Sequence, residues 1–186
     1  KIVDKQGTRS TSNSSIEATD TPKTPSIVRT TATDTLTDSH SAYPGSEVTI
    51  KDEVVFENLI VGRTYTLKGE LLDRNTGRVI KDANGNPVTA EKKFVPESVN
   101  GSVTIYFTFP ADRSFRGKTT VAGETLVPEE GDPIVHADIT DEAQTVRFPR
   151  IGTTAVGAET EDHVVRAGED AKIIDTVSYE NLVVGQ

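Results

Sequence analysis

Five polar residues lie where β-strand alternation predicts apolar side chains, and their types are those of an acyl-transfer site. They are a threonine, a glutamine, a histidine and two acids: Thr30, Gln144, His136, Asp52 and Glu124. A buried polar group needs a hydrogen-bond partner, and a buried charge needs one more strongly. A single such residue could be a satisfied core group or an error of register, but several together predict a functional cluster.

Thr30 and Gln144 carry the two functional groups of an ester-forming reaction. A hydroxyl beside a base is a nucleophile for acyl transfer, and a carboxamide is an acyl donor whose leaving group is ammonia. If the two side chains meet in the core, attack of the hydroxyl on the amide carbon leaves an ester. The chain has no cysteine, and such a cross-link requires neither a thiol nor an oxidising compartment.

Each of these residues alone has a simpler structural interpretation. A buried Asp52 commonly satisfies a turn or the backbone, and Gln144 could be an edge-strand amide. His136 alone is more often an ordinary core or surface histidine than a catalyst. The other two histidines, His40 and His163, lie in loop-like sequence and are interpreted as structural or incidental.

The elements that must position the cluster have a hydrophobic period of two residues. Residues 48–56, 65–71 and 103–109 alternate between apolar and polar side chains, which is typical of half-buried strands. Asn84-Gly85 is a strong hairpin signal. Residues 82–87 begin like a calcium loop but lack the acid at position twelve, so we expect a turn, no metal site and no cofactor. Short strands separated by Gly, Asn and Pro turns predict an all-β fold, an immunoglobulin-like antiparallel β-sandwich.

An internal repeat organises the chain. Residues 28–63 align without a gap with residues 151–186, at a constant offset of 123. The match pairs Thr30 with Thr153 and Asp52 with Asp175. A gap-free match of this length predicts tandem domains.

The repeat and the composition divide the chain into three parts. Residues 1–26 are rich in Ser, Thr and Pro and are predicted to be a flexible linker. Residues 27–149 form one complete domain, and residues 150–186 form the truncated start of a second copy. Residues 143–155 span the seam and read as one strand interrupted by Pro149 and Gly152. The first residues, KIVDK, do not resemble a natural start, so we expect a fragment.

Composition excludes several classes of partner. The formal net charge is −9 and no basic run is present, so we expect no nucleic-acid partner. No apolar stretch approaches the roughly 20 residues that span a bilayer, so we expect no membrane insertion of this fragment. Aromatic residues make up 5% of the chain, which disfavours a glycan-binding module.

The order of the motifs resembles one family. I-x-T-T-A is followed by D-x-V-x-[FY]-x-N-L-x-x-G, then by V-A-x-E, then by His136 and Q-T-V. This order resembles the VaFE-repeat domains, also called Thr-Gln ester-bond domains, which build stalks of Gram-positive surface adhesins. The resemblance covers residues 27–149 completely and residues 150–186 as the opening third of a second copy.

The resemblance implies roles for the five residues. A spontaneous ester would join Thr30 on the first strand to Gln144 on the last. His136 would act as general base and acid, and Asp52 and Glu124 would share one proton, so that the protonated acid stabilises the charge on the glutamine carbonyl. Which acid holds the proton stays open at the level of sequence.

Strand phase favours Thr30 over Thr31 as the nucleophile. The aromatic residue of the family's V-A-F-E motif is replaced by Gly123, which leaves a packing gap beside Glu124. In the second copy the equivalents are Thr153 and Asp175.

The resemblance implies a structural function outside the cell. We expect a stalk domain of a cell-surface adhesin, anchored to the cell wall through regions outside this fragment. Its partners would be neighbouring repeats of the same chain and, through a tip domain not present here, a host surface ligand. It would not be an enzyme, because forming the cross-link is a single turnover. The alternatives are an immunoglobulin-like binding or spacer module without a cross-link, and a hydrolase that uses the same side chains.

Overall fold

The computed structural model describes residues 23–165, 167–168 and 170–182. The first 22 residues, most of the predicted linker, lie outside the described residues. Strand β1 starts at Ser26, and nearly all of the regular structure that follows is β-strand.

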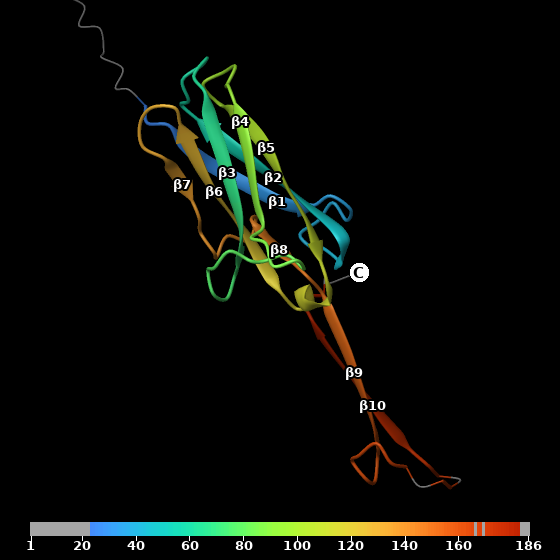
Figure 1. Cartoon of the computed structure of the whole chain (residues 1–186). Coiled ribbons are helices and arrows are strands. Elements are labelled where there is room, and N and C mark those ends of the chain that lie inside the picture. Colours follow the sequence, from blue (N-terminus) through green and yellow to red (C-terminus); the bar gives the residue numbers. More distant parts are fainter. Residues whose placement is uncertain (1–22, 166, 169, 183–186) are drawn as a thin grey trace, which may run out of the picture.

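Two antiparallel sheets form the body of the molecule (Figure 1). The first has the order β1-β2-β5, with bounds Ser26–Asp34, Gly45–Glu57 and Gly101–Ala111. The second has the order β4-β3-β6-β7, and β8 also pairs with β6; its bounds are Thr89–Phe94, Tyr65–Asp73, Thr119–Pro128, Ile134–His136 and Thr145–Arg147. A single 3₁₀ turn, η1 (Arg113–Phe115), lies between β5 and β6. The predicted all-β antiparallel fold is confirmed.

The core lies between the two sheets and consists of the alternate residues of the predicted strands. Each of the three predicted inward rows is buried along its whole length: Val48, Ile50, Asp52, Val54, Phe56, then Tyr65, Leu67, Gly69, Leu71, then Val103, Ile105, Phe107, Phe109. Burying each large apolar side chain contributes about 1.5–3 kcal/mol. The core closes at one end around Phe115 and Phe148, whose ring centroids are 5.2 Å apart. The sequence period therefore identifies the inner faces correctly.

The predicted Asn-Gly turn is also present. Gly85 has φ +86°, a conformation that glycine adopts without steric cost. The side chain of Asp82 accepts hydrogen bonds from the backbone N–H groups of Asn84 at 2.9 Å and Asn86 at 2.8 Å. These contacts close the turn from within.

The predicted strand through residues 143–155 is divided in two. Gln144 lies in the turn immediately before β8, not within a strand, and β8 ends at Arg147. The chain then passes through Pro149, which lacks a backbone N–H and cannot donate to a ladder. Strand β9 begins at Arg150 and belongs to a different sheet.

Strands β9 (Arg150–Gly157) and β10 (Ile173–Glu180) form a two-stranded ribbon that extends away from the sandwich (Figure 1). Its register reproduces that of β1 and β2 from Gly152 to Gly157, but the irregularity between Ile27 and Arg29 of β1 is not repeated. Thr153 faces Val177, as Thr30 faces Val54. The ribbon's side chains are largely exposed, because no second sheet covers it within the described residues 150–165, 167–168 and 170–182.

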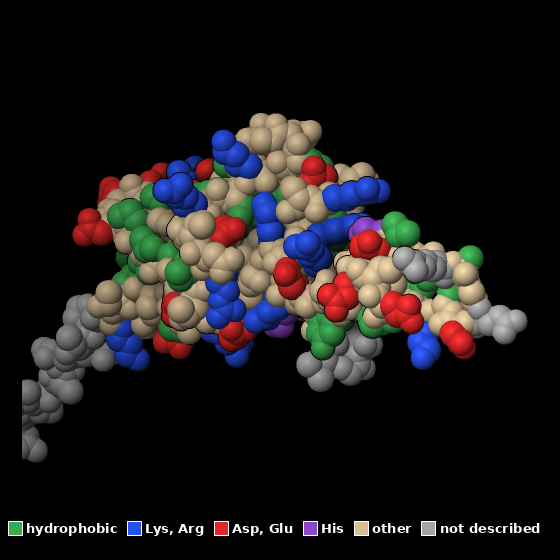
Figure 2. All heavy atoms as spheres, turned by 90° about the horizontal axis from the view of Figure 1, so that it is seen from below, with side chains coloured by type: hydrophobic (Ala, Val, Ile, Leu, Met, Phe, Trp, Pro, Cys, Tyr) green, Lys and Arg blue, Asp and Glu red, His purple; other side chains and the backbone are tan. Residues whose placement is uncertain are grey.

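The surface carries charges of both signs. Figure 2 shows basic and acidic side chains interspersed over one face of the sandwich. In the described part of the chain, no helix is both long and apolar enough to cross a bilayer.

Candidate functional site

Four of the five residues singled out in the sequence are buried between the two sheets. Thr30, Glu124 and Gln144 are 1% exposed and Asp52 is fully buried. They come from β1, β6, the turn before β8 and β2, so four separate segments meet at one place. His136 ends β7 and is half-buried.

Backbone pairing fixes the relative positions of these segments. Ala32, on the same face of β1 as Thr30, pairs with Asp52 on β2. The N–H of Ala32 donates to the carbonyl of Ala143 at 2.9 Å, and the N–H of Ala122 donates to the carbonyl of Gln144 at 3.0 Å. The turn that carries Gln144 is thereby held between β1 and β6.

The side chains of Thr30 and Gln144 each retain an unused buried oxygen. The Nε2 atom of Gln144 donates to Oδ1 of Asp52 at 3.5 Å, which is the long limit of a hydrogen bond. The Oε1 atom of Gln144 and the Oγ1 atom of Thr30 have no hydrogen-bond partner within the described residues. Such groups cost free energy when they stay unpaired in a core. The two carboxyl oxygens of Glu124 and Oδ2 of Asp52 are likewise buried without a hydrogen-bond partner among the described residues, so the unpaired oxygens are concentrated in this cluster.

The two acids form a pair with raised pKa values. Burial raises the pKa of Glu124, and the neighbouring charge of Asp52 raises it further, to about 10. Burial also raises the pKa of Asp52, although interactions with Glu124, Gln144 and His136 oppose that shift. At neutral pH Glu124 is therefore the acid that carries the proton, because ionising both would place two negative charges in a core of low polarity. A protonated carboxyl is a hydrogen-bond donor.

His136 has an acidic neighbour that the sequence did not reveal. His136 pairs with Glu124 across β6 and β7. Its Nε2 atom lies 3.6 Å from Oδ2 of Asp141, while Oδ1 of Asp141 accepts a hydrogen bond from the N–H of Ala143 at 2.8 Å. Asp141 lies in a turn, outside any strand alternation, so its phase carried no signal. Its position three residues before Gln144 was the available clue.

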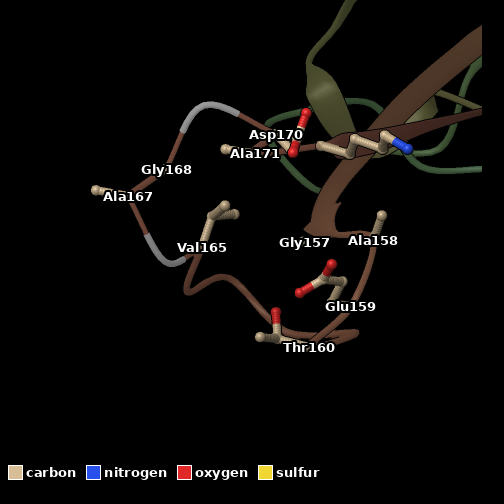
Figure 3. Close-up of a pocket in the computed structure, with 10 residues that line it drawn as sticks. Gly157, Ala158, Glu159, Thr160, Val165, Ala167, Gly168, Asp170 and Ala171 are labelled. Atoms are coloured by element: carbon tan, nitrogen blue, oxygen red, sulfur yellow. The ribbon is translucent and has the colours of Figure 1, made fainter.

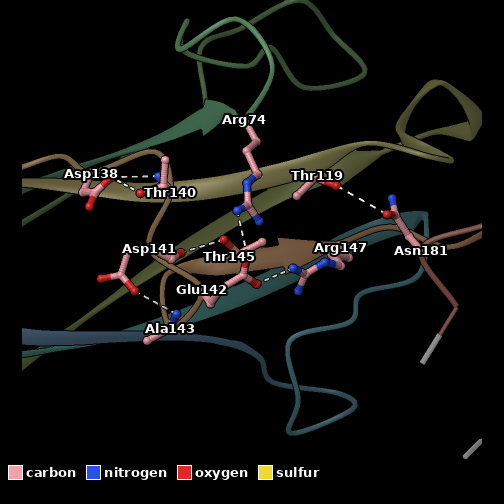
Figure 4. Close-up of polar contacts among 10 residues, drawn as sticks. All are labelled: Arg74, Thr119, Asp138, Thr140, Asp141, Glu142, Ala143, Thr145, Arg147 and Asn181. Carbon is pink, nitrogen blue, oxygen red and sulfur yellow. Dashed lines mark hydrogen bonds and ion pairs between the residues drawn. The ribbon is translucent and has the colours of Figure 1, made fainter. Parts of the chain in front are cut away.

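An ion-pair cluster on the surface holds the same turn from outside, and it too was missed. Glu142 accepts from Arg74, on the turn after β3, at 2.7 Å and also pairs with Arg147 on β8 (Figure 4). The hydrogen bonds from the two guanidinium groups lower the pKa of Glu142 to about 2. The cluster links the β3 turn to the segment that carries Gln144.

Two glycines beside Glu124 have opposite surroundings. Gly69 pairs with Glu124, and a Cβ added there would lie 2.4 Å from Cδ1 of Ile105 in the facing sheet. A Cβ on Gly123 would point outward and meet Leu72 at 3.4 Å, which is close to ordinary contact. An open groove of about 410 Å³ adjoins Gly123. The gap predicted at Gly123 therefore lies outside the sandwich, on the face opposite the acid pair.

The downstream positions are not assembled into a similar cluster. Thr153 and Asp175 are exposed on the β9–β10 ribbon. A hollow of about 270 Å³ lies in the loop between these strands, where Glu159 and Asp170 are among the lining residues (Figure 3). None of the residues singled out in the sequence lines this hollow.

Comparison with known proteins identifies a family and a similar fold. Residues 25–148 and residues 149–186 each match the family described as T-Q ester bond containing domain. A bacterial adhesin from Mobiluncus mulieris containing intramolecular disulfide, isopeptide and ester bond cross-links has a similar fold. In one crystal form the TM-score is 0.52, with 14% identity over 85% of this chain and 75% of that chain. In a second form the TM-score is 0.49, with 14% identity over 85% and 74%. No curated protein matches the chain.

Proposed function

The chain belongs to the family of T-Q ester bond containing domains, and from this premise we propose that residues 27–149 cross-link themselves by an ester between Thr30 and Gln144. The Oγ1 atom of Thr30 attacks the side-chain carbonyl carbon of Gln144, and a C–O bond forms. The C–N bond of the amide then breaks, and ammonia leaves with the proton of the threonine. The observation that carries the proposal is the pair of unpartnered buried oxygens on these two side chains.

The surrounding groups have complementary roles in this step. His136 takes the proton of Thr30 and returns it to the leaving nitrogen, and Asp141 stabilises the imidazolium between these transfers. Asp52 accepts from Nε2 of Gln144 and so orients the amide. The proton of Glu124 stabilises the negative charge that develops on Oε1 of Gln144.

The reaction consumes the protein's own side chains. The acyl donor and the nucleophile are both used up in the ester, and the core admits no second substrate to the buried pair. The domain is therefore a single-turnover, self-modifying structural unit and not a turnover enzyme.

A cross-link between these positions gives the domain a mechanical function as a stalk unit. Thr30 lies on the first strand and Gln144 next to the last strand of the sandwich, so tension on the chain ends passes through the ester and bypasses the core between them. The adhesin from Mobiluncus mulieris shares this fold and contains such bonds. The chain thus acts as a spacer of an extracellular surface adhesin, anchored to the cell wall by other regions. Neighbouring repeats adjoin it, and a separate tip domain contacts the host.

Intact-protein mass spectrometry of the full chain tests the ester. The wild type should be lighter than the sequence mass by one ammonia, and Thr30→Ala should restore the full mass. Thr31→Ala is the matched control, because Thr31 pairs with Glu53 on the opposite face of the strand; it should keep the deficit. A wild type of full mass would refute the ester and favour a plain spacer or binding module. Loss of the deficit in Thr31→Ala instead of Thr30→Ala would reassign the nucleophile.

A further inference from the structure

The side-chain amide of Asn181, one residue after β10, contacts the end of the sandwich from the other side of the seam. Its Nδ2 atom lies 3.0 Å from the carbonyl oxygen of Gly117, 3.1 Å from that of Lys118 and 3.3 Å from that of Phe148. These three carbonyls belong to the end of the sandwich from which the ribbon departs. The amide thus bridges two segments that the chain itself joins only through Pro149.

The three carbonyls form one small, well-defined surface. The N–H of Gly117 donates to the carbonyl of Phe148, and the N–H of Phe148 donates to the carbonyl of Lys118, both at 2.9 Å. Gly117 has φ +82°, and a Cβ there would lie 2.5 Å from Oε2 of Glu180. The positive φ favours glycine at this turn, whereas the carboxylate of Glu180 is the end of a flexible side chain and could move away. The hydroxyl of Thr119 also donates to Oδ1 of Asn181 at 3.5 Å, and Figure 4 shows the two side chains facing each other.

The matching residue of the sequence repeat has the same conformation. Asn181 has φ +57° and Asn58 has φ +61°, a left-handed region in which asparagine is tolerated. The amide of Asn58 also faces upstream, and its Nδ2 atom donates to the carbonyl of Thr24, which precedes β1, at 3.3 Å. The turn therefore presents its amide toward the preceding segment in both places.

We propose that the Glu-Asn-Leu turn at residues 180–182 is a docking element that holds the second copy against the domain that precedes it. Its partner is the C-terminal pole of an upstream domain of the same kind, represented here by Gly117, Lys118 and Phe148. The amide binds carbonyls of that pole and fixes the direction of the next domain. Consecutive domains then behave as one rod, and this rigidity does not depend on the ester.

The full chain in solution tests this docking. Residual dipolar couplings of backbone amides should show β9 and β10 aligned as one body with β1–β8. Asn181→Gly keeps the left-handed backbone and removes the amide, so it should reduce the couplings of the ribbon severalfold while leaving those of the sandwich unchanged. Asn181→Asp keeps size and backbone tolerance but replaces the donor with oxygen, and it should have the same effect.

Asn58→Gly is the matched control, because it removes the equivalent amide at the opposite pole of the sandwich. It should leave the alignment of β9 and β10 as in the wild type. The proposal would be overturned if the residual dipolar couplings of β9 and β10 were unchanged in Asn181→Gly. It would also be overturned if these couplings fell in Asn181→Gly but not in Asn181→Asp. The mass deficit should persist in all three variants, which separates this result from the fate of the ester.

Discussion

The amide nitrogen of Gln144 lies 3.5 Å from Oδ1 of Asp52, so two side chains 92 positions apart meet inside the core. This contact uses the donor end of the amide and leaves the carbonyl oxygen without a partner among the described residues. It orients the amide with its leaving nitrogen beside a carboxyl group.

Removing the proton donor should slow ester formation without preventing folding. Glu124→Leu replaces a buried carboxyl with an apolar side chain of similar size, and the loss of one donor to a developing oxyanion costs about 100- to 1000-fold in rate. Glu124→Gln keeps an N–H donor and should recover part of that loss. The measurement is the fraction of cross-linked mass with time after refolding. Equal rates for Glu124→Leu and the wild type would rule out a role for this acid.

The stability of the domain without its cross-link should fall as pH rises. The pKa of Glu124 is about 10 in the folded state, against 4.5 as its ordinary value. Between these values the unfolded chain has lost the proton that the folded chain retains, so stability decreases as pH increases. The raised pKa of Asp52 acts in the same direction.

Urea unfolding of Thr30→Val from pH 5 to pH 9 measures this dependence. The free energy of unfolding should be highest at the acidic end and decline steadily toward pH 9. Adding Glu124→Gln, which cannot ionise, should flatten the slope. A stability that rises over this range would contradict the assignment of the buried proton.

The ester should add stability by restricting the unfolded chain. It closes a loop from residue 30 to residue 144, and cross-linking a loop of about 100 residues removes chain entropy worth about 4–5 kcal/mol. Thr30→Val is a suitable reference because Oγ1 of Thr30 makes no hydrogen bond within the described residues, so its loss leaves no partner unpaired. Thr30→Ser retains the hydroxyl and should keep the bond. Denaturant titration of the wild type, Thr30→Val and Thr30→Ser measures the difference in the free energy of unfolding. Equal unfolding midpoints for Thr30→Val and the cross-linked wild type would refute a stabilising effect of the ester.

Asp141 should matter for the rate and not for the final fold. Asp141→Asn removes the negative charge that faces the imidazole of His136 at 3.6 Å, so proton transfer should slow by about tenfold or more. Asp138→Asn is the control in the same loop: the carboxylate of Asp138 accepts hydrogen bonds from Thr140, and its charge acts on His136 without forming an ion pair with it among the described residues, so this variant should slow the reaction less. The time course of the mass deficit measures the rate of ester formation in each of the two variants. Identical time courses for the two variants would leave Asp141 without a specific function.

The sequence revealed those parts of the molecule that follow strand periodicity. Alternation with a period of two residues indicates which face of a strand is buried. Thr30, Asp52 and Glu124 were identifiable because each is a polar residue on such an otherwise apolar face. Asp141 and the Arg74–Glu142 pair were not identifiable in this way, because turns have no period and their contacts depend on how distant segments meet. Gln144 was found from the correct phase, although it lies in the turn before β8.

The two glycines next to Glu124, Gly69 and Gly123, should respond in opposite ways to substitution by alanine. Gly69→Ala places a Cβ 2.4 Å from Ile105 and 2.6 Å from Phe107, both in the facing sheet, so the sheets must separate locally. Overpacking of this kind costs about 1–3 kcal/mol and should also disturb the pairing of Gly69 with Glu124. Gly123→Ala is the matched control, because its Cβ meets Leu72 at 3.4 Å on the outer face; it should be nearly neutral or slightly stabilising, since alanine restricts the unfolded chain more than glycine does. Thermal unfolding and the completeness of the mass deficit measure both effects. If Gly123→Ala blocked the ester while Gly69→Ala did not, the inward direction assigned to Glu124 would be wrong.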